Sequence, residues 1–450
     1  MIPIKTITDT ANTIINTGNL TPNQYAQLSG ASISLSNTTP KVAASISALP
    51  AASGNKGLLF YVTAVQEYYF SDGTTWRNDF TSDVEVMNVI AYAWGRNTGQ
   101  LGDNTTSNRS SPVVVVGGIT NWTQIASGGQ HNLGLTSTGI AYAWGQNSYG
   151  RLGDNSTTTR SSPVTVVGGI TNWSQLAAGG SHSLGVTGAG IAYAWGRNFT
   201  GQLGDNTTSN RSSPVTVVGG ITNWSQIAAG YAQSLGLTSA GVAYAWGYNT
   251  VGTLGDNTTT SRSSPVAVVG GITNWRQLSA GDSHCMGLTS AGILYGWGRN
   301  SSGMLGDNSS TDRSSPVTVV GGITTWSQVA ASSHTLGVTS TGILYAWGQN
   351  NFGQLGDNST TSRSSPVTPI GGITNWSQIA NGGLHSLGAT SAGTAYAWGY
   401  NSYGRLGDNS TTNRSSPVIV VGATTNWTQL RGGGNHSLGL RVFVTITKGF

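Results

Sequence analysis

The sequence predicts an all-β protein: a seven-bladed β-propeller with four-stranded blades, one of them closed by both chain ends, and a small N-terminal β-containing attachment segment. Three observations predict this class. A unit of about fifty residues recurs along most of the 450-residue chain, which is typical of solenoids and propellers. Each copy holds four short strand patterns between turn residues. The first and last copies are incomplete in complementary ways.

Two tryptophans mark each copy of the unit. The first belongs to a Trp-Gly dipeptide that recurs every 50 or 51 residues, at Trp94, Trp144, Trp195, Trp246, Trp297, Trp347 and Trp398. The second follows at Trp122, Trp173, Trp224, Trp275, Trp326, Trp376 and Trp427. In the first full copy we expect strands at Trp122–Ala126, His131–Thr136, Ile140–Trp144 and Pro163–Val167. Four such strands in each of seven units are typical of propeller blades around an axis.

The ends of the repetitive region predict how the propeller closes. It begins near Val86 with a third strand (Ile90–Trp94) and a fourth strand (Pro112–Val116), without the first two. It ends with a first and a second strand, Trp427–Leu430 and His436–Val444, and no third. We therefore expect the two ends to pair in a shared seventh blade, which removes the exposed sheet edges that promote aggregation.

Residues 1–83 do not match the repeat. We divide the chain into an extended attachment segment (1–45), a small β-hairpin module (46–83) and the propeller (84–450). The hairpin is expected near Leu58–Val62 and Glu67–Phe70. This pattern resembles small β-modules in bacteriophage tail-fibre and virion-appendage proteins, which implies attachment to a particle.

The composition excludes several classes of function. Only 8% of residues are charged, against about 25% in an average soluble domain. Lysine occurs four times and basic residues form no run, so we expect no nucleic-acid partner. The N-terminus has no apolar core of a signal peptide and no stretch approaches eighteen apolar residues, so we expect neither Sec secretion nor membrane insertion.

One motif links the copies to a known family. Ala-Tyr-Ala-Trp-Gly-X-Asn-X-X-Gly-X-Leu-Gly-Asp-Asn is followed by Ser-Pro-Val and then Gly-Gly-X-His-Ser-Leu-Gly-Leu. Over residues 84–445 this resembles the regulator-of-chromosome-condensation repeat. That family includes a chromatin-bound nucleotide exchange factor, a plant ultraviolet receptor and a bacterial β-lactamase inhibitor. The resemblance implies the fold, but it assigns no activity, because one fold hosts many functions.

Two sets of repeated polar residues are interpreted as structural. All six histidines occupy one repeat position, with Gln233 at the seventh: His131, His182, His284, His334, His385 and His436. Metal ligands lie about 2 Å from one ion, whereas facing sheets pack about 10 Å apart, so these imidazoles are not expected to share a metal. Each long loop also holds one Asp and one Arg, such as Asp103 and Arg109. One carboxylate is too few for calcium, and an Asx turn or an Asp–Arg pair is the better interpretation.

No catalytic constellation is evident, and we expect neither enzyme activity nor a cofactor. Cys285 and His284 are adjacent in a strand, so their side chains point to opposite faces. The loop after Trp-Gly varies most between copies, which predicts either a binding face or drift at exposed positions. The candidate binding residues are Arg96, Gln146, Tyr149, Arg151, Arg197, Phe199, Tyr248, Arg299, Phe352, Tyr400, Tyr403 and Arg405.

These observations favour a non-enzymatic virion protein, displayed on the particle surface as a phage fibre, spike or decoration. Residues 1–83 would bind other virion proteins, and the propeller face would bind a host-surface glycan or protein. The alternative is a bacterial protein-binding propeller, acting as an inhibitor or scaffold in the cytoplasm or outside the cell by a non-Sec route. Nucleotide exchange on a GTPase is a third, weaker hypothesis.

Overall fold

The computed structural model describes the backbone of short strands between residues 6 and 77, then residues 83–422 and 425–448. Side chains are described for residues 87–422 and 425–443. Contacts divide the chain into two units, Met1–Met87 with Val444–Phe450 and Asn88–Phe443. The second unit is the propeller.

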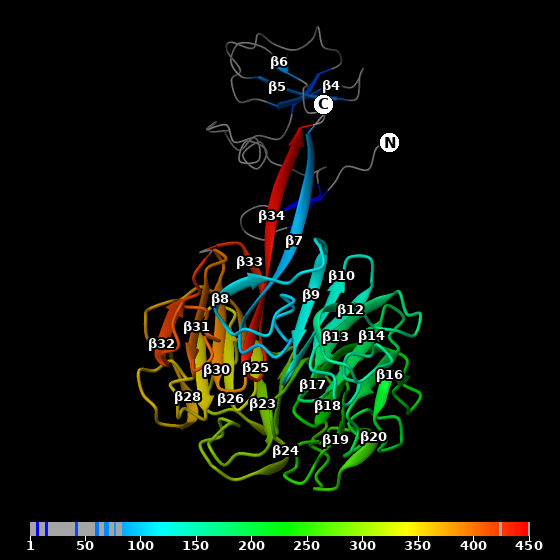
Figure 1. Ribbon diagram of the computed structural model, residues 1–450. Helices are drawn as coiled ribbons and strands as arrows, with labels where there is room; N and C mark the ends of the chain where they lie inside the picture. Colours follow the sequence, from blue (N-terminus) through cyan, green and yellow to red (C-terminus); the bar gives the residue numbers. More distant parts are fainter. Residues whose placement is uncertain are drawn as a thin grey trace. The chain divides into compact units, whose positions relative to one another are not determined.

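The propeller is built from seven four-stranded antiparallel sheets, as predicted (Figure 1). Blade 1 consists of β9 (Trp122–Ser127), β10 (His131–Thr136), β11 (Ala141–Gly145) and β12 (Arg160–Thr165). Blade 2 consists of β13 (Trp173–Ala178), β14 (His182–Thr187), β15 (Ala192–Gly196) and β16 (Arg211–Thr216). Blade 3 consists of β17 (Trp224–Ala229), β18 (Gln233–Thr238), β19 (Ala243–Gly247) and β20 (Arg262–Ala267). Blade 4 consists of β21 (Trp275–Ala280), β22 (His284–Thr289), β23 (Leu294–Gly298) and β24 (Arg313–Thr318). Blade 5 consists of β25 (Trp326–Ala331), β26 (His334–Thr339), β27 (Leu344–Gly348) and β28 (Arg363–Val367). Blade 6 consists of β29 (Trp376–Asn381), β30 (His385–Thr390), β31 (Ala395–Gly399) and β32 (Arg414–Ile419).

Blade 7 contains both ends of the repetitive region, which confirms the predicted closure. Its strand order is β33 (Trp427–Gly432), β34 (His436–Lys448), β7 (Asp83–Gly95), β8 (Arg109–Val114). The rings of Tyr92 and Trp427 meet edge-to-face at 5.7 Å, as Tyr142 and Trp122 do at 5.6 Å in blade 1. The shared blade thus has the packing of a continuous one.

The fourth strand of each blade begins earlier than the sequence suggested. In blade 7 we expected Pro112–Val116, but β8 spans Arg109–Val114. A register shift after Ala93 brings Gly95 opposite Arg109, so pairing begins before the proline. Proline is tolerated there because β8 is the edge strand of its sheet and needs no N–H on its open side.

The hydrophobic core lies between neighbouring blades. One cluster joins Leu133 and Leu135 of blade 1 to Trp173 and Leu176 of blade 2. Within a blade, the ring of Trp122 lies across β10 at Gly134, where an added Cβ would stand 2.3 Å from the ring. Glycine is therefore required there by close approach, and the tryptophan contacts both strands.

The other unit is described through its strands. β1 (Thr6–Thr8) pairs with β2 (Ile14–Asn16), and a four-stranded sheet has the order β3 (Lys41–Ala43), β4 (Leu59–Val62), β5 (Glu67–Ser71), β6 (Trp76–Arg77). The antiparallel pair β4–β5 is the expected hairpin. β3 adds a parallel strand from the segment 1–45. Within the described residues, no helix has the length and apolarity needed to cross a membrane.

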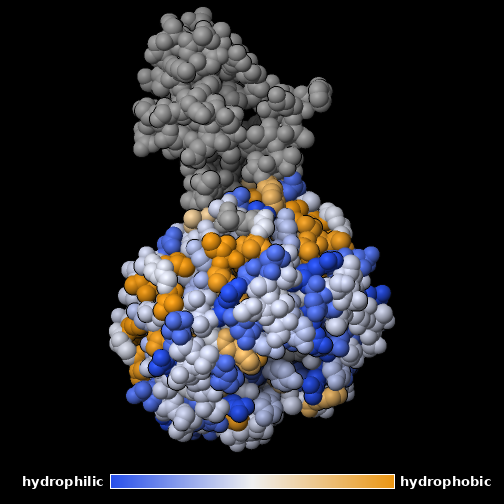
Figure 2. Space-filling model, turned by 60° about the vertical axis from the view of Figure 1, so that its left-hand side comes forward, coloured by the Kyte–Doolittle hydropathy of each residue, from blue (hydrophilic) through white to orange (hydrophobic). Residues whose placement is uncertain are grey.

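The two ends of the propeller differ in what they present. One end, which we call the loop face, carries the turns between first and second strands and the long loops between third and fourth strands. In blade 1 the turn and the long loop meet where the backbone N–H of Gln146 donates to the backbone carbonyl of Gln130 at 2.9 Å. Unit Asn88–Phe443 begins at the opposite end, where the Val89 amide donates to the Thr120 carbonyl. Figure 2 shows a surface mostly of near-neutral hydropathy, as the low charge content predicts.

Candidate binding face

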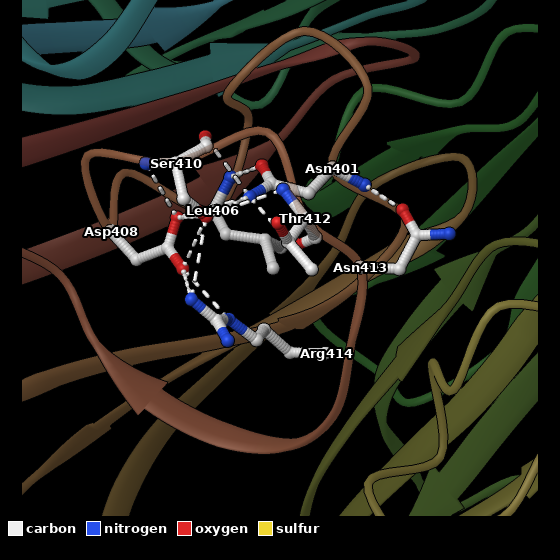
Figure 3. Close-up of polar contacts among 7 residues, drawn as sticks. All are labelled: Asn401, Leu406, Asp408, Ser410, Thr412, Asn413 and Arg414. Carbon is white, nitrogen blue, oxygen red and sulfur yellow. Dashed lines mark hydrogen bonds and ion pairs between the residues drawn. The ribbon is translucent and has the colours of Figure 1, made fainter.

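Each long loop is held by a compact polar network, shown for blade 6 in Figure 3. The Asn401 amide donates to Asp408 Oδ1 at 3.0 Å, and its oxygen accepts from the Leu406 amide at 3.0 Å. Arg414 Nε donates to the second Asp408 oxygen at 2.9 Å. The Ser410 amide and hydroxyl also donate to Asp408, which closes an Asx turn. Both carboxylate oxygens are thereby used by the protein.

The same ion pair recurs in every blade. The pairs are Asp103–Arg109, Asp154–Arg160, Asp205–Arg211, Asp256–Arg262, Asp307–Arg313, Asp357–Arg363 and Asp408–Arg414. Burial alone would raise the pKa of Asp103, but hydrogen bonds from Thr105, Arg109 and Asn97 leave it below its usual value. The described residues contain no group of three or more His, Cys, Asp or Glu that could hold a metal.

The six histidines and Gln233 form a ring of bonds from each blade to the next. All are fully buried, and each contacts a side chain beside the next blade's ring position. The bonds join His131 to Ser183 (2.8 Å), His182 to Ser234 (2.9 Å), Gln233 to Cys285 (3.9 Å), His284 to Thr335 (2.9 Å), His334 to Ser386 (2.6 Å), His385 to Ser437 (2.8 Å) and His436 to Asn132 (2.8 Å).

The hydroxyl partner determines which histidine nitrogen carries the proton. Ser234 donates its hydroxyl hydrogen to the Gln202 carbonyl at 2.8 Å, so His182 Nε2 must donate to the serine oxygen. His182 Nδ1 is then an unprotonated acceptor and has no hydrogen-bond partner in the structure. Burial lowers the pKa of His182 to about 3, which keeps the ring neutral.

A glutamine clamp, which the sequence analysis missed, joins the innermost strands. The Gln124 side chain donates to the Leu176 carbonyl at 3.1 Å and accepts from the Leu176 amide at 2.9 Å. The repeat places an equivalent glutamine two residues after each inner-strand tryptophan: Gln175, Gln226, Gln277, Gln328, Gln378 and Gln429. The fixed Trp-X-Gln spacing was the available signal. Its bonding role depends on the next blade's backbone, which the sequence does not show.

The propeller axis is narrowed on the loop face by a ring of turns. The Gly129 amide donates to the Gly179 carbonyl at 3.0 Å, and Gly180 repeats this to Gly230 at 3.0 Å. A Cβ on Gly128 would stand 2.3 Å from the Gly179 oxygen, so these turns need glycine. They line an axial cavity of 430 Å³ whose side-chain lining includes Arg151, Tyr231, Asp282 and Asn381.

Four of the predicted binding residues form a first arginine cluster, across blades 1 and 2. The guanidinium of Arg151 lies 5.4 Å from the ring centre of Tyr149, and that of Arg197 lies 5.5 Å from the same ring. Arg197 also lies 4.8 Å from the ring of Phe199, which is 54% exposed. Cation–π contacts of this geometry orient planar guanidinium groups.

Five others form a second arginine cluster across blades 5, 6 and 7. Arg405 lies 4.4 Å from the ring centre of Tyr400 and 5.5 Å from that of Tyr403. The guanidinium of Arg96 lies 5.4 Å from the ring centre of Tyr403, and the rings of Phe352 and Tyr400 pack with their centres 4.5 Å apart. The structure thus groups nine of the twelve predicted residues into two clusters.

The remaining three predicted residues lie apart from these clusters. Gln146 and Tyr248 are partly buried, and exposed Arg299 donates to Ser301 at 3.1 Å. The varying loop positions differ in exposure, because Arg151 and Arg405 are buried, at 3% and 0% exposed. The backbone carbonyl of each arginine also accepts a hydrogen bond from a serine hydroxyl of the next blade, Ser183 for Arg151 and Ser437 for Arg405.

Comparison with known families agrees with this architecture. Profiles of the regulator of chromosome condensation (RCC1) repeat match residues 90–135, 138–186 and 189–237, and a second such profile matches 122–151 and 173–202. The profile of the RCC1-like domain matches residues 220–442. The chain belongs to the RCC1-repeat family. The tail-fibre resemblance of the N-terminal residues remains a prediction.

Several characterised proteins share the repeat or the fold. The chain is 33% identical over 238 residues to the ultraviolet-B receptor UVR8 of Arabidopsis thaliana, which covers 51% of this chain and 54% of that protein. It is 32% identical over 206 residues to the probable E3 ubiquitin-protein ligase HERC4 of Homo sapiens, covering 44% of this chain and only 19% of the ligase. The chain thus spans about half or less of the length of these relatives.

Two solved structures share this propeller fold. Human WBSCR16 superposes with a TM-score of 0.69 at 22% identity, covering 79% of this chain and 99% of that one. Prp20p of Saccharomyces cerevisiae, described with its binding to Gsp1p and histones, superposes with a TM-score of 0.71 at 22% identity, covering 81% and 94%. At this identity the likeness concerns the fold.

Proposed function

We propose that this RCC1 propeller is a non-enzymatic binding protein whose loop face holds a partner protein. The observation that carries the proposal is the pair of arginine–aromatic clusters on that face. Arginine, tyrosine and phenylalanine are enriched in protein interfaces, where they supply much of the binding energy. Here they are held in place by stacking, with Phe199 and Tyr403 reaching the surface at 54% and 36% exposure.

The chemistry around the one cysteine supports a binding role over catalysis. Burial raises the pKa of Cys285 to about 12, so the thiol stays protonated and is a poor nucleophile. Thr335 donates its hydroxyl to the Met304 carbonyl at 2.9 Å, so the neighbouring His284 donates its Nε2 proton to Thr335 and not to the thiol. RCC1 propellers whose structures are described with protein partners, Prp20p with Gsp1p and with Kap60, give the proposal a precedent.

Site-specific photo-crosslinking tests this proposal. A benzophenone amino acid replaces Phe199 on the loop face, and a matched variant carries it at Ile343, which is 38% exposed in a turn at the opposite end. In cells that produce the protein, we expect the Phe199 variant to crosslink to a defined protein and the Ile343 variant not to. Crosslinking at Ile343 alone, or equally at both positions, would show that the loop face is not the binding surface.

We further propose that the partner is met on a virion surface, with residues 1–83 attaching the chain to the particle. The support is the hydroxyl- and amide-rich, weakly charged composition and the N-terminal hairpin pattern. Removing residues 1–83 should abolish incorporation, measured by mass spectrometry of purified particles. Normal incorporation of the truncated chain would refute this role, and the alternative of a bacterial scaffold or inhibitor would then be preferred.

A further inference from the structure

The charges of the propeller are unevenly neutralised. Residues 88–443 contain fifteen arginines, no lysine and nine aspartates or glutamates, all of which are aspartates. Seven of each form the loop ion pairs described above. Eight arginines and two aspartates remain outside these pairs. The net positive charge of the propeller therefore comes from arginines that form no ion pair with a carboxylate of the described residues.

Most of these arginines gather at the loop face. Six lie in its loops or at the end of the inner strand that leads into it: Arg96, Arg151, Arg197, Arg299, Arg405 and Arg431. The two remaining aspartates, Asp282 and Asp312, also lie on this face, both in blade 4. The two arginine clusters belong to blades 5 to 7 and 1 to 2, so blade 7 with its neighbours is the more positive side.

Two of the arginines, Arg151 and Arg405, are buried and have guanidinium nitrogens without a hydrogen-bond partner. Arg151 lines the axial cavity, is 3% exposed, and its Nε has no partner. Arg405 is fully buried; Nη1 donates to the carbonyl of cavity-lining Gly434 at 3.3 Å, while Nε and Nη2 have no partner. Burial lowers the pKa of Arg151 to about 10, so both groups stay charged at neutral pH. Burying an unpaired charge is energetically unfavourable unless an anion satisfies it.

We infer that the axial cavity receives a carboxylate side chain from an acidic segment of the partner protein, held by Arg151. This inference rests on the proposed function and names the chemistry of the partner. A guanidinium matches a carboxylate with two parallel hydrogen bonds, and Tyr149 holds the guanidinium plane in place. Tyr231 reaches into the same cavity with 58% of its surface open and supplies an apolar wall.

The size of the cavity fits such an occupant, and of its two charged lining side chains Arg151 attracts a carboxylate while Asp282 opposes one. Its 430 Å³ lies within the range of about 300–1,000 Å³ that is usual for ligand pockets. Many of the residues that line it are glycines, so few protein side chains occupy its volume. The surrounding arginines would attract an acidic segment before contact and raise its association rate at low salt.

The test measures binding of a synthetic peptide to the full chain by isothermal titration calorimetry. The peptide has ten residues of alternating glutamate and glycine, and its neutral counterpart has glutamine in place of glutamate. We expect the glutamate peptide to bind and the glutamine peptide not to bind. The affinity for the glutamate peptide should fall at least about ten-fold when Arg151→Gln removes the guanidinium group. Arg151→Lys should recover less than half of the lost binding free energy, because lysine lacks the planar fork.

Arg276→Gln is the matched control. Arg276 is exposed, belongs to none of the seven loop ion pairs, and donates to the Trp326 and Ser327 carbonyls away from the cavity. It removes the same charge and should change the affinity by less than about two-fold. Equal losses in the Arg151→Gln and Arg276→Gln variants would overturn the site, since they would indicate non-specific attraction. Tighter binding of a thymidine ten-mer than of the peptide would overturn the assignment to a protein carboxylate.

The outcome also separates this inference from the proposed function. If Phe199 crosslinks to a partner but the glutamate peptide does not bind, the loop face is the binding surface and the inference about carboxylate chemistry fails. If the peptide binds through Arg151 and the Phe199 variant crosslinks to nothing, the anion site stands and the proposed partner protein is refuted.

Discussion

His436 Nε2 lies 2.8 Å from Oδ1 of Asn132, although 304 residues separate them in the chain. This contact joins blade 7, which holds both ends of the repetitive region, to blade 1. It is one member of the ring in which every blade bonds to its neighbour through a buried histidine or glutamine. Closure therefore uses the same interaction as every other blade junction.

The ring of histidine and glutamine bonds between blades predicts which substitutions each blade junction tolerates. Replacing His182 by glutamine should keep a donor at this junction, as Gln233 does by donating to the Gly281 carbonyl at 2.9 Å and to Cys285 Sγ at 3.9 Å. We expect a loss of under about 1 kcal/mol in unfolding free energy. His182→Ala leaves a cavity and removes the donor, which should cost about 2–4 kcal/mol. Urea unfolding followed by tryptophan fluorescence measures both. Equal losses in the two variants would mean that the hydrogen bond contributes nothing.

The buried histidines also predict an acid-sensitive stability. Burial lowers the pKa of His182, His284, His334 and His436 to about 3, so the unfolded chain binds more protons than the folded one between pH 6.5 and 3. Stability is then fully present above pH 6.5 and is lost as the pH falls towards 3, by up to about 1.4 kcal/mol per pH unit for each histidine.

Thermal unfolding at pH 7.0 and 4.5 measures this effect, with His182→Gln as the variant. The wild-type midpoint should fall steeply at pH 4.5, and the variant should lose less because it has one titrating site fewer. The loop aspartates lose their stabilising ionised form only near or below pH 4, because their pKa values are lowered. An identical pH dependence of wild type and variant would show that His182 is not buried in its neutral form.

The fold followed from the sequence because repetition multiplies a weak signal. A single copy of Trp122–Ala126 or Ile140–Trp144 is too short to assign with confidence, but seven copies at one spacing indicate a blade. The missing strands before Ile90 and after Leu440 then determined the closure. Strand ends were harder, because the register shift that extends β8 back to Arg109 depends on the backbone of β7.

The candidate site was only partly predictable. Variation between copies marked Arg151 and Arg405, but their burial depends on the curvature that brings each loop over the next blade. Tyr231 and Asp282 were missed, although both replace the second glycine of a turn that reads Gly-Gly in blades 1 and 2. That departure was the available signal. Its meaning became visible only when the turns met around the axis.

The loop network predicts different effects for two aspartates of different blades. Asp408→Ala removes the acceptor of Asn401, Ser410 and Arg414, and should lower the unfolding free energy by about 1–3 kcal/mol and speed hydrogen exchange at the Leu406 amide. Asp312→Asn should change it by under about 0.5 kcal/mol, because other blades carry asparagine there with the same bond, as Asn413 does. A neutral Asp408→Ala variant would show that the network does not stabilise the loop.

The glutamine clamp predicts a cost at each blade junction. Gln124→Met keeps the side-chain volume but leaves the Leu176 amide and carbonyl unpaired, which should cost about 1–3 kcal/mol. Gln146→Met, at the partly buried loop position, should cost under about 0.5 kcal/mol. Chemical denaturation of both variants provides the comparison. A loss at Gln124 no larger than at Gln146 would mean that water replaces the clamp without penalty.

Asp282 predicts a pH dependence of binding in the axial cavity. The side chain is open to cavity water yet surrounded by protein, and this desolvation raises its pKa to about 6, while a bond with Ser332 lowers it in part. At pH 7.5 its carboxylate opposes an acidic peptide, whereas at pH 5 it is mostly neutral, so the wild-type chain should bind the glutamate peptide more tightly at pH 5. Arg151 stays charged across this range.

The Asp282→Asn variant should bind the glutamate peptide at pH 7.5 about as tightly as wild type does at pH 5, and should lose most of the pH dependence. Calorimetric titrations at the two pH values decide this, and an unchanged pH dependence in the variant would place the titrating group elsewhere.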